Sequence, residues 1–167
     1  MKNKKGQVWT TDYVIGLMLF ILVLIITVKM VISIQPSQDQ IIVYRDAVHL
    51  SDAILSKGYP ANWTTTDVLL PGIADNNRIN NTKLLQFQNM EYGQTKILMH
   101  TISDYLFFIK NGTGIINTGK CVYGYNITTN INCEPQLNTI KYENLAKIER
   151  MVIYNSTVVV MTIYAWN

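Results

Sequence analysis

An uncharged apolar run near the N-terminus constrains this chain more than any other feature. No charged residue occurs in residues 14–28, and the apolar character continues to residue 34. At about 1.5 Å per residue, a helix over residues 14–34 is about 30 Å long, which matches the hydrocarbon core of a bilayer. The run therefore predicts a single transmembrane helix, with Lys29 near its outer end, where a long side chain can reach the interface.

Three lysines precede the run and account for the whole formal net charge of +3: Lys2, Lys4 and Lys5. The rest of the chain carries eleven Lys and Arg against eleven Asp and Glu. By the positive-inside rule the N-terminus is expected in the cytoplasm and everything after residue 34 outside the cell membrane, which the chain crosses once. Nucleic acid is not expected as a partner, because no cluster of Lys and Arg occurs beyond these three lysines.

The sequence after the run decides whether the apolar segment is kept. Ser33-Ile34-Gln35-Pro36 contains no small-x-small cleavage pattern, and no cysteine directly follows it for lipid attachment. The segment is therefore predicted to be retained. Two alternatives remain open, an uncleaved signal anchor and a segment that is clipped on its cytoplasmic side.

The residues before the run favour the second alternative. Lys4-Lys5-Gly6-Gln7 ahead of a hydrophobic helix resembles the class III signal peptide of archaeal type IV pilins and pilin-like proteins. The resemblance implies that a prepilin peptidase cuts between Gly6 and Gln7. It also implies that the product is a major or minor structural subunit of a surface filament, with other pilin subunits and the pilus assembly platform as partners.

One position departs from the family pattern. Many archaeal members carry a glutamate at the fifth mature position, where this chain has Thr11 and its first acid is Asp12. In related filaments an early acid is thought to meet the new terminal amine of a neighbouring subunit. The resemblance therefore implies an assembly contact at Asp12, and the alternative is a solvated carboxylate near the lipid headgroups.

A second resemblance covers most of the chain. Five short motifs occur in the order found in a group of uncharacterised archaeal pilin-like proteins: Gly58-Tyr59-Pro60 with Trp63, Gly72-Ile73, Asn81-Thr82-Lys83-Leu84, Asp104-Tyr105 and Tyr164-Ala165-Trp166. This resemblance supports an architecture and implies no activity.

The segment after the run is predicted to form a second, amphipathic helix. Pro36 is expected to kink or restart the helix, and Ser37 or Asp39 can cap the restarted part. Residues at helical spacing then continue to Gly58, and these are Ile41, Tyr44, Ala47, Val48, Ser51, Ile54 and Leu55. The predicted organisation is a leader over residues 1–6, a transmembrane and spine helix over residues 7–57, and a head over residues 58–167.

The head is predicted to contain a mixture of short helices and strands. A helix capped by Asn80 or Asn81 and a helix over residues 92–100 precede a strand over residues 103–110. A further strand is expected within residues 120–127, a short turn or helix within residues 140–145, and a hairpin with Asn155-Ser156 at its tip. The predicted fold is α+β and type IV pilin-like, a small antiparallel sheet against the amphipathic half of the long helix.

Two features agree with export. Cys121 and Cys133 are the only cysteines, and in an exported domain such a pair most simply forms one disulfide, with buried free thiols as the alternative. Asn-x-Ser/Thr sequons occur five times, which is more than composition alone explains and suggests N-glycosylation: Asn62, Asn80, Asn111, Asn126 and Asn155.

The sequence offers little that points to catalysis. His49 and His100 are the only histidines, and neither has a partner at a recognised metal spacing. His49, Ser51 and Asp52 are the residue types of a catalytic triad, but Ser51 lies two positions after His49 and one before Asp52, and helix positions at those separations do not face one another. We therefore expect no enzyme, cofactor or metal. The alternative to a filament subunit is a non-polymerising anchored protein for extracellular binding or adhesion, with aromatic loops around Tyr59, Trp63, Tyr123 and Tyr125.

Overall fold

The computed structural model describes residues 5–34 and 37–167, and the chain divides into two units, Met1–Ser37 and Gln38–Asn167. The first unit contains one helix, α1 (Lys5–Ile34). Within it Thr10–Ser33 is long and apolar enough to cross a membrane, and none of that span is buried. The expected apolar helix is therefore present.

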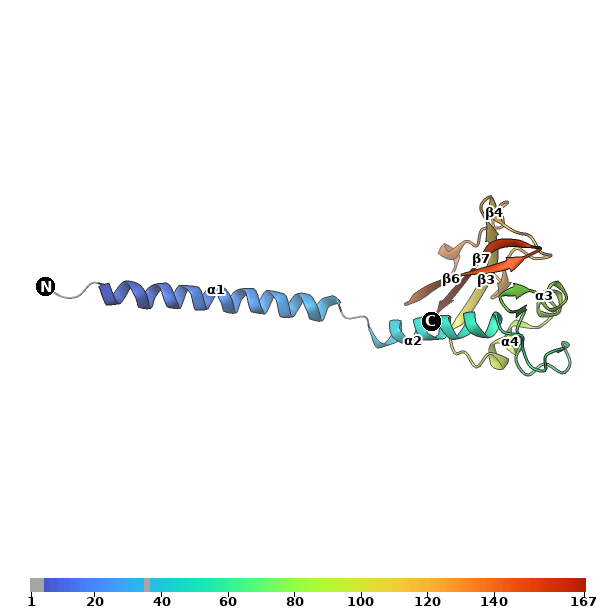
Figure 1. The fold of residues 1–167 in the computed structure, drawn as a ribbon, viewed down its shortest axis with the longest axis horizontal. Coiled ribbons are helices and arrows are strands. Elements are labelled where there is room, and N and C mark those ends of the chain that lie inside the picture. Colours follow the sequence, from blue (N-terminus) through green and yellow to red (C-terminus); the bar gives the residue numbers. More distant parts are fainter. Residues whose placement is uncertain (1–4, 35–36) are drawn as a thin grey trace. The chain divides into compact units, whose positions relative to one another are not determined.

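The second unit begins with α2 (Gln38–Ile54), which packs on β6 (Leu145–Tyr154) and β7 (Thr157–Trp166) of the sheet (Figure 1). Its buried face agrees with the predicted one at Ala47, Ser51 and Ile54, which are all buried. The prediction was wrong at the N-terminal end of the helix, where Ile41 and Tyr44 are exposed and Val43 is buried. Residues 41–44 are consecutive and apolar, so the helical period alone does not identify which of them packs.

The sheet of the second unit has the order β1-β2-β6-β7-β3-β4, with β5 also paired to β3. Its strands are β1 (Ala74–Asp75), β2 (Arg78–Ile79), β3 (Asp104–Asn111), β4 (Gly114–Ile115), β5 (Tyr123–Gly124), β6 (Leu145–Tyr154) and β7 (Thr157–Trp166). The sheet is mixed and not purely antiparallel as predicted, because β2 pairs with β6 in parallel at Arg78 and Ile153. The other strand pairs are antiparallel.

The predicted hairpin is confirmed as β6 and β7, with Tyr154 opposite Thr157. Asn155 and Ser156 both have positive φ angles, of 46° and 63°. This backbone conformation matches the right-handed twist of the two strands it joins. As predicted, β7 is a central strand, lying between β6 and β3.

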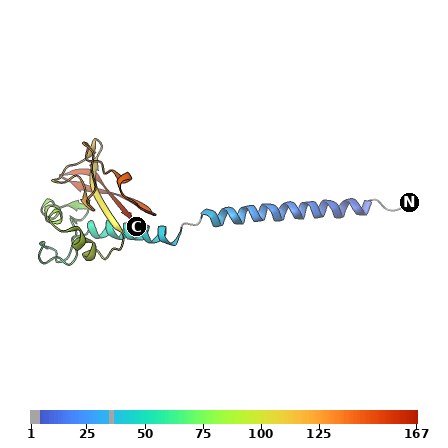
Figure 2. The ribbon, with the colours of Figure 1, turned by 180° about the vertical axis from the view of Figure 1, so that it is seen from behind.

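Three short helical segments complete the second unit. They are α3 (Asn81–Gln88), α4 (Tyr92–Leu98) and a 3-10 turn, η1 (Leu137–Thr139). Asn80 caps α3 as predicted, because its side chain accepts hydrogen bonds from the backbone amides of Thr82 and Lys83. Figures 1 and 2 show α3 beside the C-terminal end of α2, where the buried Lys83 ammonium donates to the carbonyl of Lys57.

The sheet is covered on both faces. Tyr105, Phe107 and Ile109 of β3 lie in the main core together with α2 and α3. Leu106 and Phe108, which alternate with them, lie in a second core with Trp166. Partly buried side chains between residues 115 and 140 pack on this second core. The long connection from β4 to β6 therefore serves as the cover of one sheet face.

Only Tyr123–Gly124 of the strand expected within residues 120–127 pairs with the sheet. Gly124 has a φ of 95°, and a Cβ there would lie 2.6 Å from the Tyr105 carbonyl oxygen. This close approach requires glycine. The expected turn or helix within residues 140–145 is absent, since η1 ends at Thr139 and β6 begins at Leu145.

Candidate functional site

The first candidate surface is α1. Lys5, Gly6 and Gln7 of the predicted cleavage motif lie in its first turns, whereas Lys2 and Lys4 lie outside the described residues. Asp12 is exposed on the same helix. From Tyr13 to Ile32 the large apolar side chains of α1 are all exposed. A helix that is apolar all round is stable only when lipid or other helices cover it.

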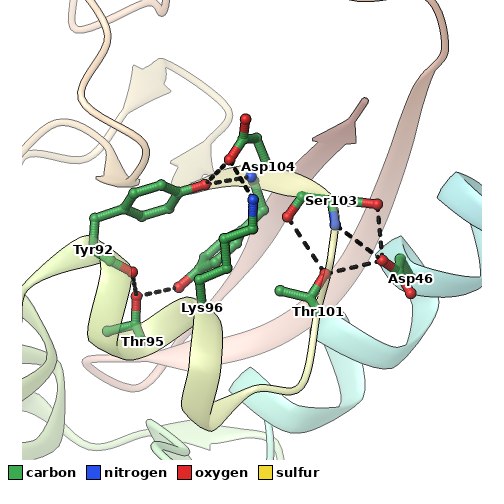
Figure 3. A network of polar contacts seen from close by, with 8 residues as sticks. Asp46, Tyr92, Thr95, Lys96, Thr101, Ser103 and Asp104 are labelled. Atoms are coloured by element: carbon green, nitrogen blue, oxygen red, sulfur yellow. Dashed lines mark hydrogen bonds and ion pairs between the residues drawn. The ribbon is translucent and has the colours of Figure 1, made fainter.

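A polar network ties α4 to β3 (Figure 3). The hydroxyl of Tyr92 donates to the carboxylate of Asp104 at 2.8 Å, and the ammonium of Lys96 donates to the same oxygen at 2.7 Å. Tyr92 also accepts from the backbone amide of Tyr105. The Tyr105 hydroxyl in turn donates to Thr95 at 2.7 Å. Each buried polar group here has a partner, which is what a structural tie requires.

The tyrosines of this network are held in their neutral form. Burial raises the pKa of Tyr105 to about 12. Burial, followed by the hydrogen bond to Asp104, raises the pKa of Tyr92. Neither hydroxyl therefore acts as a base near neutral pH.

Figure 3 also shows a second polar network, which connects α2 to the residues just before β3. One carboxylate oxygen of Asp46 accepts hydrogen bonds from the Thr101 hydroxyl, the Ser103 amide and the Ser103 hydroxyl, at 3.0, 3.2 and 2.8 Å. This cluster was not predicted from the sequence. The sequence features that could have indicated it are an acidic residue, Asp46, next to the apolar face of a predicted helix, and the hydroxyl residues Thr101 and Ser103 at the start of a predicted strand.

The triad-like set on α2 does not assemble. His49 is exposed. The Ser51 hydroxyl donates to the Val48 carbonyl at 2.7 Å, and it accepts from Arg150. Arg150 also pairs with Asp52. Within residues 5–34 and 37–167, no group of three or more His, Cys, Asp or Glu side chains is arranged to hold a metal ion.

Cys121 and Cys133 form a disulfide, as expected, with an S–S distance of 1.99 Å. The bond closes a loop within the connection that covers the second core. The five sequon asparagines are all exposed, but their side chains differ. Asn80 caps α3, and Asn111 accepts three hydrogen bonds from Thr113 and Gly114. Asn155 accepts from Asn81.

A pocket of about 460 Å³ lies between the connection from α3 to α4 and the segment around β5. Tyr92, Tyr125, Gln88 and Lys120 line it together with Cys121. Of the four aromatic residues expected around binding loops, Tyr123 and Tyr125 reach this pocket. Trp63 does not, because it is 1% exposed and its indole donates to the Gly72 carbonyl in the core. Gln88, Tyr92 and Lys120 were not predicted to lie here, because they belong to distant segments.

Comparison of the chain with protein-family models, with curated proteins and with solved structures finds no match.

Proposed function

We propose that this chain is a structural subunit of an archaeal type IV pilus-like surface filament, inserted in the membrane as a prepilin and cleaved after Gly6. The observation that carries the proposal is the surface of α1, on which no side chain of Thr10–Ser33 is buried. The class III leader motif directly before this span supports the same function. The resemblance of the leader to class III signal peptides is the basis for proposing this family. The exposed apolar side chains of α1 form the surface that filament assembly would cover.

The physical basis of assembly lies in this surface. Apolar side chains in water carry an unfavourable free energy that is roughly proportional to their area. A bundle of α1 helices from several copies would bury these side chains against one another, so that the helices could leave lipid without meeting water. The second unit has its own core, so burial of α1 in such a bundle would not require that core to change.

Mass spectrometry of the native protein tests the processing step. We expect a mature N-terminus at Gln7. An intact Met1 would show that the leader is not processed and would leave an uncleaved anchor.

Electron microscopy of the host cells tests assembly. We expect filaments with the wild-type chain and none with Gly6→Val, in which cleavage is blocked. Gly93→Ala is the matched control, because a Cβ at Gly93 meets nothing within 4 Å, and filaments should persist. Filaments that form from the uncleaved Gly6→Val chain would contradict the proposal.

A second candidate function is an anchored binding protein that does not polymerise. The pocket beside the disulfide favours it, since the second unit forms that pocket alone. A processed chain at the cell surface that forms no filament would support this candidate over the first.

A further inference from the structure

The pocket beside the disulfide has the features of a small-molecule site. Its volume of about 460 Å³ lies within the usual range of about 300–1,000 Å³ for such sites. Its walls come from α3, α4 and the segment around β5, which meet only in the folded chain. A ligand site in this pocket does not require the chain to form filaments.

Two tyrosine rings form a corner of the pocket. The rings of Tyr92 and Tyr125 are 5.7 Å apart and almost perpendicular, at 89°. Tyr92 is fixed by its hydrogen bond to Asp104. Tyr125 is fixed by an edge contact with Trp166 and by its amide, which donates to the Tyr105 carbonyl. Such a corner is preorganised, so binding would cost little side-chain entropy.

Polar groups with unused hydrogen-bonding capacity surround this corner. The hydroxyl of Tyr125 and the amide of Asn126 make no side-chain hydrogen bond within the part of the chain that the structure describes. The Lys120 ammonium donates to the Gln88 carbonyl at 3.1 Å, which leaves further N–H groups.

The charges of the side chains that line the pocket limit which kinds of ligand it can bind. Lys120 is the one charged side chain among the residues that line the pocket, and it is exposed. Without a second cation or any carboxylate, the pocket is not built for a multiply charged anion or for a metal ion. Aromatic faces combined with amide, hydroxyl and ammonium groups suit a ligand with an apolar face and many hydroxyls.

We propose that this pocket, in a chain whose Asn126 carries no glycan, binds a neutral saccharide of one or two rings, with the C–H face of a sugar on the Tyr92–Tyr125 corner and its hydroxyls on Lys120, Asn126 and the Tyr125 hydroxyl. Each polar group named is a donor or acceptor that sugar hydroxyls complement. The two rings provide the apolar contact.

The test uses the full chain, made in a bacterium that does not glycosylate sequons and reconstituted in lipid nanodiscs, because sugar-based detergents would occupy the site. The probes are glucose, galactose, mannose, their N-acetylamino forms and the matching disaccharides. Saturation-transfer difference NMR should show magnetisation transfer from protein to at least one probe. Empty nanodiscs give the background.

Variants decide whether the transfer comes from this pocket. Tyr125→Ala should weaken binding about tenfold, and Asn126→Ala, at an exposed side chain, should weaken it without affecting the fold. Tyr142→Ala, an exposed tyrosine that does not line the pocket, should bind as the wild type does. Transfer at background for every probe, or transfer that Tyr125→Ala and Asn126→Ala leave unchanged, would overturn the proposal. If glucuronic acid bound while none of the neutral sugars did, and Lys120→Ala abolished that binding, the proposal that the ligand is a neutral saccharide would be wrong.

Discussion

The carboxylate of Asp46 on α2 accepts a hydrogen bond from the Ser103 hydroxyl at 2.8 Å, although the two residues lie 57 positions apart in the chain. The same oxygen accepts from the Ser103 amide and from the Thr101 hydroxyl. Thr101 and Ser103 are themselves buried. This cluster fixes the approach of the chain to β3 against α2.

Asp46→Ala should therefore destabilise the second unit by about 1–3 kcal/mol, since it leaves buried donors without an acceptor. Urea unfolding followed by tryptophan fluorescence measures this, because Trp63 and Trp166 are buried. Asp52→Ala is the control on the same helix. Its side chain is 68% exposed, and its loss should cost no more than about 1 kcal/mol. Equal losses of unfolding free energy in Asp46→Ala and Asp52→Ala would contradict the role of Asp46 as the acceptor for these buried donors.

The packing of α2 on the sheet gives a second prediction. Leu50 is 0% exposed in the main core, so Leu50→Ala should lower the free energy of unfolding by about 2–5 kcal/mol. Leu69→Ala makes the same chemical change at a side chain that is 62% exposed, and it should change stability by less than about 0.5 kcal/mol. The denaturant midpoints of the two variants are compared with that of the wild type. A Leu50→Ala midpoint as high as that of Leu69→Ala would rule out the packing described.

The sequence predicted elements well where local signals agree. Alternating β-branched residues around Asn155-Ser156 identify the β6–β7 hairpin, and Asn80 identifies the start of α3. The predicted packing face of α2 was right at Ala47, Ser51 and Ile54, which are buried. It was wrong at the start of the helix, where Ile41 and Tyr44 are exposed and Val43 is buried. Residues 41–44 are consecutive and apolar, and where apolar residues follow one another around a helix only its tertiary partners decide which of them are buried.

The candidate pocket was less predictable still. Tyr92 and Tyr125 meet there from segments 33 positions apart, and no spacing rule in the sequence links them. The parallel pairing of β2 with β6 was also missed, because no local sequence pattern indicates it. It rests on one pair, Arg78 and Ile153, which is too short to leave a pattern in the sequence.

The disulfide gives a third prediction. Cys121 and Cys133 close a loop of thirteen residues, counting both cysteines, and in the chain-entropy model such a loop contributes about 3 kcal/mol. The Cys121→Ser, Cys133→Ser double variant should therefore unfold at a clearly lower urea concentration than the oxidised wild type. Dithiothreitol should lower the wild-type midpoint to that of the variant, and it should leave the variant unchanged. A wild-type midpoint that does not respond to reduction would argue against the disulfide as a source of stability.

The buried tyrosines predict how stability responds to alkaline pH. Burial raises the pKa of Tyr105 to about 12, above the value of about 10 expected in the unfolded chain. The unfolded state therefore loses its proton first as the pH rises. The stabilisation is fully present below pH 10 and is lost as the pH rises from about 10 through 12.

Tyr105→Phe isolates this contribution, because phenylalanine cannot ionise. The variant loses the hydrogen bond to Thr95 and should be less stable at pH 7, but its free energy of unfolding should fall less steeply between pH 10 and 12. Urea midpoints measured across this range give the slope. Tyr142→Phe, at an exposed tyrosine, should keep the wild-type slope. The same slope in all three chains would mean that Tyr105 ionises as readily in the folded protein as in the unfolded one.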